Sequence, residues 1–519
     1  MSGAPESDGA AVSSARAAEP DDDQNGVSSS PAPADVEPAG AGAPSITALV
    51  ERAQKAQRAW AKEPLRLRLR AMKKVERRLL ARIEDLANVV HDERGTPLEE
   101  AAITEVLANA RLFGAWRREA IEKFEPSVVE LGQLVYPGKA GRVEREPLGV
   151  VALFAPAGHP VAAPIRAIVP ALICGNAVVF QPSPGAPRTA KAVAALFDGL
   201  VPAGVVTVLP ADGDPSEAAI DAGVDLVLFT GDRARCARLA ALAAERGVRC
   251  RLEAGANDAD IERTARALVW AAFHDAGRGG GALKRVVVEK SAERALTSRL
   301  AELAKELGAK ESVIPELANA SQADALRAPI EAALEAGAEI VADDEARVAP
   351  TVVSLPEGAR DLALALGDAG GPVLTVCVVA NEDAAVAEVH RQRDAQTISV
   401  WTKRVGYGRT FARRLRAPVV VVNNHAFGEL IGEMPWTVSG ASGWGAASGP
   451  SAIDALSQRK FVLTDRMVVK RETWWFPYTP ALRALTIAKS LLAGGRGIFG
   501  RIRGLAQLLV SLPKRLGEG

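Results

Sequence analysis

The sequence predicts an α/β fold that contains two parallel β-sheets. Between residues 150 and 255, short β-branched runs alternate with stretches of helical periodicity, and the same alternation returns after residue 281. Such alternation is typical of parallel sheets that are covered by helices on both faces. The chain has 519 residues, of which 48% are hydrophobic, so it is long enough for two or three domains with large buried cores.

Residues 46–125 precede the first sheet and are predicted to form amphipathic helices, because apolar residues such as Leu79, Ile83, Leu86 and Val90 recur at helical spacing. The predicted strands are 150–154, 178–180, 205–209, 226–230, 249–253, 286–288, 373–379, 398–402 and 419–422. In the second α/β unit, helices are expected at 382–391 and 407–415. No repeat of fixed period is present, which excludes solenoids and propellers.

Charge and cysteine content exclude several classes of protein. Lys and Arg together number 63, as do Asp and Glu, so no net basic field favours a nucleic-acid partner. Four widely spaced cysteines fit neither a disulfide scaffold nor a cysteine-ligated zinc site, and no metal site is expected. The sequence shows neither a signal peptide nor an apolar run of spanning length, so a reducing cytoplasm is the expected location.

The two ends of the chain differ in charge. Residues 1–44 contain eight acidic residues and one arginine with almost no large apolar side chains, which predicts a disordered acidic tail. Residues 472–519 begin with an aromatic cluster and continue as two helical stretches rich in arginine and lysine. The second stretch carries one apolar stripe, formed by Ile498, Ile502, Leu505, Leu509, Leu512 and Leu516.

Two interpretations of the stripe stay open at this stage. A basic amphipathic helix beside an aromatic cluster is typical of a segment that lies on a membrane surface, here through residues 480–516. The protein would then be cytoplasmic and peripheral on the inner face of a membrane. Alternatively, the helices pack on the body of the protein or on another subunit, with the tryptophans as core.

A series of ordered segments carries a family resemblance. The chain reads PLGVVALFAPAGHP, PALICGNAVVFQPS, VDLVLFTGD, RLEAG, FHDAGRGGGALKRVVVE, GGPVLTV, ISVWT, VVVVNN and PWTVSGASGWG. In sequence and spacing this resembles the aldehyde dehydrogenase superfamily from about residue 45 to 470. The resemblance implies a Rossmann-type dinucleotide-binding domain, a second α/β catalytic-type domain, an oligomerisation hairpin, and NAD or NADP as cofactor. It also implies a homo-oligomer, either a dimer or a tetramer.

The resemblance also implies domain boundaries. The dinucleotide-binding-type domain would span 45–254 and include a hairpin segment at 127–147. The catalytic-type domain would span 255–440, and 441–471 would return to the first domain and complete the oligomerisation hairpin. The remaining 472–519 form the C-terminal extension described above.

The chain departs from the family at positions that carry catalytic residues in the family. The family's nucleophilic cysteine, which attacks the aldehyde as a thiolate, aligns with Gly280. The asparagine that donates to the oxyanion aligns with Gly158, and the neighbouring His159 is the alternative donor. Glu253 matches the general-base glutamate and is retained.

The positions that hold the cofactor in the family are altered as well. Gln181 replaces the lysine that grips the adenosine ribose, Ser183 is kept, and Pro184 replaces a glutamate. Thr230 and Gly231 match the motif at the pyrophosphate, but Asp232 replaces a serine and would repel the pyrophosphate. At the nicotinamide ribose, Asp368 stands one methylene short of the family's glutamate. Cofactor binding is therefore doubtful.

Three hypotheses follow. The first is an aldehyde dehydrogenase homologue that has lost NAD(P)-dependent aldehyde oxidation and acts as a scaffold or regulatory subunit. The alternative is a functioning NAD(P)-dependent oxidoreductase that acts on an aldehyde with altered active-site chemistry and Glu253 as base. A third is a membrane or partner adaptor, whose localisation depends on the residues after Glu472.

Overall fold

The computed structural model describes residues 44–518, apart from 133–135, 137, 157, 184, 212, 231–232, 247–248, 252–260, 279–281, 310–319, 343–349, 367–370, 392–396, 426–433, 435, 438–445, 449–450, 467–471 and 495–496. The predicted acidic tail, 1–44, falls almost wholly outside the described residues. From Ser45 onward the chain forms one unit, and Ser45 caps its first helix by accepting a hydrogen bond from the Ala48 amide at 3.2 Å.

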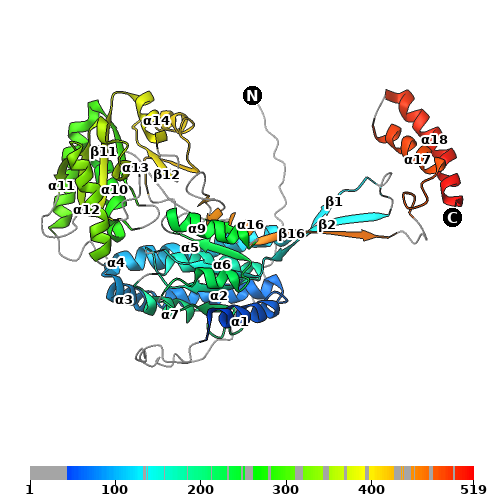
Figure 1. Cartoon of the computed structure of the whole chain (residues 1–519), viewed down its shortest axis with the longest axis horizontal. Helices are drawn as coiled ribbons and strands as arrows, with labels where there is room; N and C mark the ends of the chain where they lie inside the picture. Colours follow the sequence, from blue (N-terminus) through cyan, green and yellow to red (C-terminus); the bar gives the residue numbers. More distant parts are fainter. Residues whose placement is uncertain are drawn as a thin grey trace, which may run out of the picture. The chain divides into compact units, whose positions relative to one another are not determined.

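Helices come first along the chain, as the apolar periodicity predicts. They are α1 (Ile46–Trp60), α2 (Leu65–Ala81), α3 (Ile83–Arg94), α4 (Leu98–Glu100), the π-helix η1 (Ala101–Leu107) and α5 (Ala108–Phe124). Their apolar faces are buried, with Val75, Leu79 and Trp116 fully inaccessible to solvent. In Figure 1 these helices lie beside the first sheet, where they form part of its core.

The first sheet has the strand order β5-β4-β3-β6-β7, and all of its pairs are parallel. Its strands are β3 (Val150–Phe154), β4 (Ala177–Gln181), β5 (Val206–Val208), β6 (Leu226–Phe229) and β7 (Arg249–Arg251). Helices α6 (Ala162–Cys174), α7 (Pro187–Ala194), α8 (Ser216–Asp221) and α9 (Arg233–Glu245) connect them. This order reverses direction beside β3, as in a Rossmann fold, so the predicted fold class is confirmed.

The second sheet has the order β8-β11-β10-β9. Its elements are α10 (Ile261–Phe273), β8 (Arg285–Glu289), α11 (Lys290–Gly308), α12 (Ala320–Glu335), β9 (Glu339–Ala342), β10 (Thr351–Leu355), β11 (Val373–Val379) and α14 (Glu382–Arg391). This sheet is the predicted second α/β unit, and one of its pairs is not parallel, because β9 pairs with β10 in the antiparallel sense. An antiparallel edge strand on a parallel sheet is common, since an edge strand needs only one neighbour.

Two further strands form a separate parallel pair. These are β12 (Thr397–Val400) and β13 (Val419–Val422), with α15 (Val405–Ala412) between them. The sequence places α15 two or three residues too late at both ends, whereas the bounds predicted for α14 are confirmed.

A three-stranded antiparallel sheet joins two distant parts of the chain. It consists of β1 (Ser127–Val129), β2 (Lys139–Pro147) and β16 (Ser457–Asp465), in the order β1-β2-β16. Its strands come from the two segments that the resemblance assigns to an oligomerisation hairpin, and β2 pairs with β16 along nine residues. Two short strands, β14 (Trp436–Thr437) and β15 (Ala446–Ser448), pair separately, and α16 (Ser451–Ala455) precedes β16.

The C-terminal extension contains α17 (Pro480–Ala493) and α18 (Gly497–Gly517), which pack against each other. Among the helices that the structure describes, none combines the length and the apolar character needed to cross a bilayer.

Candidate functional site

The predicted site residues that the structure describes lie where the strands of the first sheet end. Gly158 lies between β3 and α6, Gln181 ends β4, and Thr230 follows β6. This carboxyl edge of a parallel sheet is where ligands bind in open α/β folds. Gly231, Asp232, Glu253, Gly280 and Asp368 lie outside the described residues, so the roles assigned to them stay predictions.

The two described cofactor positions, on β4 and after it, differ in how the protein uses them. Gln181 is buried, and its side-chain amide donates to the carbonyl of Gly213 at 3.0 Å. The Ser183 hydroxyl is also buried and has no hydrogen-bond partner in the described part of the chain. The side chain that would replace the family's ribose-binding lysine therefore holds a loop instead. Of the two positions, Gln181 is thus engaged by the protein, whereas the Ser183 hydroxyl keeps its capacity to bond a ligand.

The space beside Gly158 is occupied by a carboxylate. A side chain at position 158 would begin 2.9 Å from Oδ2 of Asp275 and 3.0 Å from the carbonyl oxygen of Arg278. Asp275 is buried, and its Oδ1 accepts a hydrogen bond from Arg278 Nη2 at 2.6 Å. Among the described residues, Asp275 Oδ2 and Arg278 Nη1 have no hydrogen-bond partner. Where the family places a donor for an oxyanion, this chain places an acceptor.

The turn that carries Asp275 is tightly constrained. It is the 3-10 segment η2 (His274–Gly277), in which Asp275, Ala276 and Gly277 all have positive φ, at 48°, 52° and 66°. A Cβ at Gly277 would lie 2.5 Å from the carbonyl oxygen of Gly371, so only glycine fits there. Lys284 Nζ donates to the carbonyls of Gly277 and Gly371 and fixes the turn against β11.

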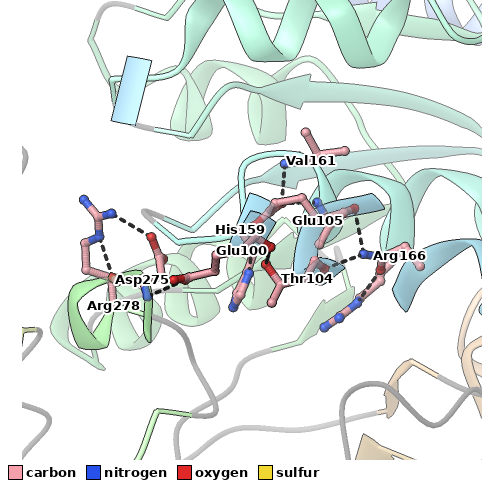
Figure 2. A network of polar contacts seen from close by, with 10 residues as sticks. Glu100, Thr104, Glu105, His159, Val161, Arg166, Asp275 and Arg278 are labelled. Atoms are coloured by element: carbon pink, nitrogen blue, oxygen red, sulfur yellow. Dashed lines mark hydrogen bonds and ion pairs between the residues drawn. The ribbon is translucent and has the colours of Figure 1, made fainter. Parts of the chain in front are cut away.

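A network of buried polar groups surrounds this turn (Figure 2). Glu105 is buried and accepts hydrogen bonds from the amides of Val161 at 3.0 Å and Ala162 at 2.8 Å, where α6 begins. Its other oxygen is 2.9 Å from Nδ1 of His159, and Glu100 Oε1 accepts from the Asp275 amide at 2.7 Å. The first helices, the start of α6 and η2 are thereby joined. Glu105 fixes the orientation of the His159 ring through Nδ1, and the oxyanion-donor role of His159 stays a prediction.

Glu100 immediately precedes a π-helix, and Glu105 lies within it. In η1, the Thr104 hydroxyl donates to the carbonyl of Glu100 at 2.8 Å. Asn109 Nδ2 donates to the carbonyls of Thr104 at 3.1 Å and Glu105 at 2.9 Å. These side chains thus donate hydrogen bonds to backbone carbonyl groups of the wider π-helical turn. Short π-helical segments are frequent at functional sites.

Burial raises the pKa of Glu100 to about 7, and the nearby negative charges of Asp275 and Glu105 act in the same direction. The Asp275 amide and His159 oppose this shift. The pKa of Arg94 is lowered by burial and next by the positive charge of Arg278. The site therefore contains a carboxyl group that titrates near neutral pH, which is a property of general acids and bases.

A Glu100→Gln variant is expected to lose much of the pH dependence of stability. Because the folded state raises the pKa of Glu100, the folded chain binds a proton more tightly than the unfolded chain. Stability thus falls as pH rises from about 4.5 through about 7, by up to about 3 kcal/mol. Glutamine has no charge to titrate, and its side-chain oxygen still accepts a hydrogen bond from the Asp275 amide. The fall in stability with rising pH should therefore disappear.

The measurement is urea denaturation at about pH 5 and about pH 8, where the change in unfolding free energy is compared between variants. Glu99→Gln is the matched control, because Glu99 is the exposed neighbour in α4. Equal pH dependence in both variants would contradict the assignment.

Sequence reasoning missed this network. Glu100 and Glu105 carry no motif, Asp275 and Arg278 lie in the segment FHDAGRGGG without an assigned role, and Glu100 and Asp275 are 175 residues apart in the chain. One signal was available, since Glu105 lies between apolar residues of a helical stretch, at a position where a glutamate is seldom buried unless it is paired.

The described thiols offer no replacement for the missing nucleophile. Burial raises the pKa of Cys174 to about 12 and that of Cys377 to about 11, and both are fully inaccessible to solvent. Both therefore act as small buried hydrophobic residues. The side chains of Cys236 and Cys250 lie outside the described residues. Within the described part of the chain, no group of three or more His, Cys, Asp or Glu side chains is arranged to hold a metal ion.

Comparison with known proteins agrees with this architecture. The model of the "Aldehyde dehydrogenase family" matches residues 30–462. A Mycobacterium tuberculosis protein, named provisionally as a succinate-semialdehyde dehydrogenase using NADP+, is 27% identical over 451 residues, which are 82% of this chain and 85% of that protein. The 4,4'-diapolycopene aldehyde oxidase of a Methylomonas species is 24% identical over 434 residues, with 81% and 82% covered.

The solved structure of an NAD-dependent aldehyde dehydrogenase from Sinorhizobium meliloti is similar, with a TM-score of 0.75 and 27% identity over 83% of this chain and 88% of that one. An NADP-dependent glyceraldehyde-3-phosphate dehydrogenase from Bacillus halodurans, solved with NADP, has a TM-score of 0.73 and 23% identity, with 81% and 91% covered. The matched model, the strand order of the first sheet and the ordered motifs agree: the chain belongs to the aldehyde dehydrogenase family.

Proposed function

We propose that this chain keeps the aldehyde dehydrogenase architecture but does not oxidise aldehydes through a thiol, and acts as a scaffold or regulatory subunit. The observation that carries the proposal is the carboxylate of Asp275 beside Gly158. An unpartnered carboxylate oxygen at this place repels the oxyanion that forms when a nucleophile attacks an aldehyde.

Two further observations support the proposal. The family's nucleophile position is Gly280, which has no side chain to attack with, and the described cysteines are buried with raised pKa values. Gln181 is engaged with Gly213, so the first contact expected for a dinucleotide is taken by the protein. Relatives are named for NAD or NADP, but these contacts argue against tight binding here.

A second candidate function rests on Glu100. A partly buried carboxyl group with a pKa of about 7, in contact with Asp275 and close to His159, is suited to proton transfer at neutral pH. This favours an oxidoreductase that acts on an aldehyde with altered chemistry. Its nucleophile would not be a described thiol.

Calorimetric titration of the whole chain with NAD and NADP separates the two candidates. We expect no heat of binding and no thermal shift at millimolar concentrations of either dinucleotide. We also expect no aldehyde oxidation from the wild type or from a Gly280→Cys variant, because cysteine alone restores neither the cofactor contacts nor the oxyanion donor.

Dissociation constants in the micromolar range would overturn the scaffold proposal. In that case Glu100→Gln decides the second candidate, since removal of a general acid or base lowers kcat by about 10²-fold or more. The control Glu99→Gln is expected to leave kcat unchanged.

A further inference from the structure

In the helical hairpin α17–α18, the fully buried side of α18 is formed by small and polar residues, with Leu508 and Leu512 half-buried beside them. The buried residues of α18 are Gly504, Ser511 and Arg515, which are spaced by seven and four residues and lie on one face. A Cβ at Gly504 would lie 2.9 Å from Leu491 Cβ and 3.0 Å from the carbonyl oxygen of Ala488. The two helices thus cross closely at Gly504, and the opposite face of α18 turns away from α17.

That opposite face is apolar and exposed. Seven large side chains of α18 are between 51% and 88% exposed: Ile498, Phe499, Ile502, Leu505, Leu509, Val510 and Leu516. At about 100° per residue, Arg501 lies at one border of this face, and Arg503 and Lys514 lie at the other. The stripe foreseen in the sequence therefore does not form the core of the hairpin, and basic residues flank it on both sides.

Arg515 attaches an aromatic loop to the end of α18. Its side chain is buried and donates to the carbonyls of Thr473 and Trp475, at 2.8 Å for Thr473, and to Glu518 at 3.0 Å. The loop presents Trp475, Phe476 and Tyr478, which are 53%, 74% and 74% exposed. Exposed aromatic residues next to an amphipathic helix are typical of proteins that contact the lipid headgroup region.

All charged side chains of the aromatic loop and the hairpin α17–α18, between residues 473 and 517, are positive. Residues 473–517 contain seven arginines and lysines and no aspartate or glutamate: Arg483, Lys489, Arg496, Arg501, Arg503, Lys514 and Arg515. A surface that complements them must therefore be anionic, and the hairpin of a second copy carries the same positive charge. Nucleic acid supplies phosphates but no apolar layer for the exposed face of α18.

We propose that α17–α18 docks the protein on an anionic lipid bilayer. The helix α18 lies in the plane of the surface with its apolar face below the headgroups, while Arg501, Arg503 and Lys514 contact lipid phosphates. The aromatic loop enters the same headgroup region. This inference is independent of whether the candidate site binds a dinucleotide.

Co-sedimentation of the full chain with vesicles tests the proposal. We expect binding to vesicles of phosphatidylcholine mixed with phosphatidylglycerol, and weaker binding to phosphatidylcholine alone. The double variant Ile502→Glu/Leu509→Glu is expected to bind at least about tenfold more weakly, since two carboxylates would enter the apolar layer and repel anionic lipid. Leu67→Glu/Leu80→Glu is the matched control, because it makes the same change at exposed leucines of α2.

The charge contribution is measured separately. In the triple variant Arg501→Gln/Arg503→Gln/Lys514→Gln, binding to the mixed vesicles should fall towards the level seen on phosphatidylcholine and lose most of its dependence on salt. Binding to phosphatidylcholine itself should change little.

Three results would overturn the proposal. One is a wild-type chain that stays in the supernatant with the mixed vesicles. Another is equal binding by the Ile502→Glu/Leu509→Glu variant and the wild type, with circular dichroism showing that both are folded. The last is a wild-type oligomer that shows no vesicle binding and that the same variant converts to a smaller species, which would assign the apolar face to self-association.

Discussion

A Glu388→Ala variant is expected to lose about 3–5 kcal/mol of unfolding free energy, because the substitution removes the partner of buried charges. Glu388 lies on α14, and its carboxylate is 3.3 Å from Arg285 Nη1 and 3.4 Å from Arg360 Nη1. Both Arg285 and Glu388 are almost fully buried, and burial lowers the pKa of Arg285. Without the carboxylate, the guanidinium of Arg285 stays buried without its negative partner.

Urea denaturation followed by circular dichroism measures this loss. The matched control is the double variant Arg285→Met/Glu388→Leu, which removes both charges and is expected to recover most of the stability. A cost below about 1 kcal/mol for Glu388→Ala would show that the pair behaves like an exposed ion pair, and would contradict the burial of Arg285.

The second large effect is expected at Glu105. Its replacement by leucine leaves the amides of Val161 and Ala162, and Nδ1 of His159, without their acceptor in a buried place. Each buried unsatisfied donor costs about 1–3 kcal/mol, so we expect a total loss of about 2–4 kcal/mol after partial relaxation. The negative charge that faces the N-terminus of α6 is lost as well.

Two further variants are compared with Glu105→Leu. Glu105→Gln keeps one oxygen acceptor and should cost less than Glu105→Leu, whereas Glu99→Leu, on the exposed side of α4, should stay within about 0.5 kcal/mol of the wild type. If Glu105→Leu and Glu99→Leu unfold at the same urea concentration, the contacts of Glu105 do not contribute to stability.

The first sheet could be predicted because short local stretches of the sequence indicate each of its strands and connecting helices. Each strand is a short β-branched run, each connection is a helix, and parallel strands joined in this way have few possible orders. Two strands of the second sheet were not predicted, the edge strand β9 and its neighbour β10, although Thr351–Leu355 is a β-branched run. The pairing sense of an edge strand depends on how the preceding chain returns to the sheet, which no local pattern records.

The vacated positions of the site could be predicted from alignment with the family, whereas what fills them could not. Gly158 is visible in the sequence as a missing side chain, but the carboxylate of Asp275 reaches that place only after two sheets have packed together. The same holds for the C-terminal stripe. Its periodicity was visible, but the close contact at Gly504 is what shows which face of α18 remains open.

The π-helix η1 has a consequence for how this segment tolerates changes in length. A hydrogen-bond repeat of five residues places Glu100 and Glu105 one turn apart on the same side, whereas in an α-helix residues five apart point about 140° away from each other. If the wide turn relaxed to an α-helical one at its present length, the two carboxylates would rotate apart, whereas deletion of one residue between them would leave them four residues apart and about 40° from each other, still on one side. The π-helical turn thus accommodates one residue more than an α-helical turn would need, and this segment could lose that residue while both carboxylates stay on one side.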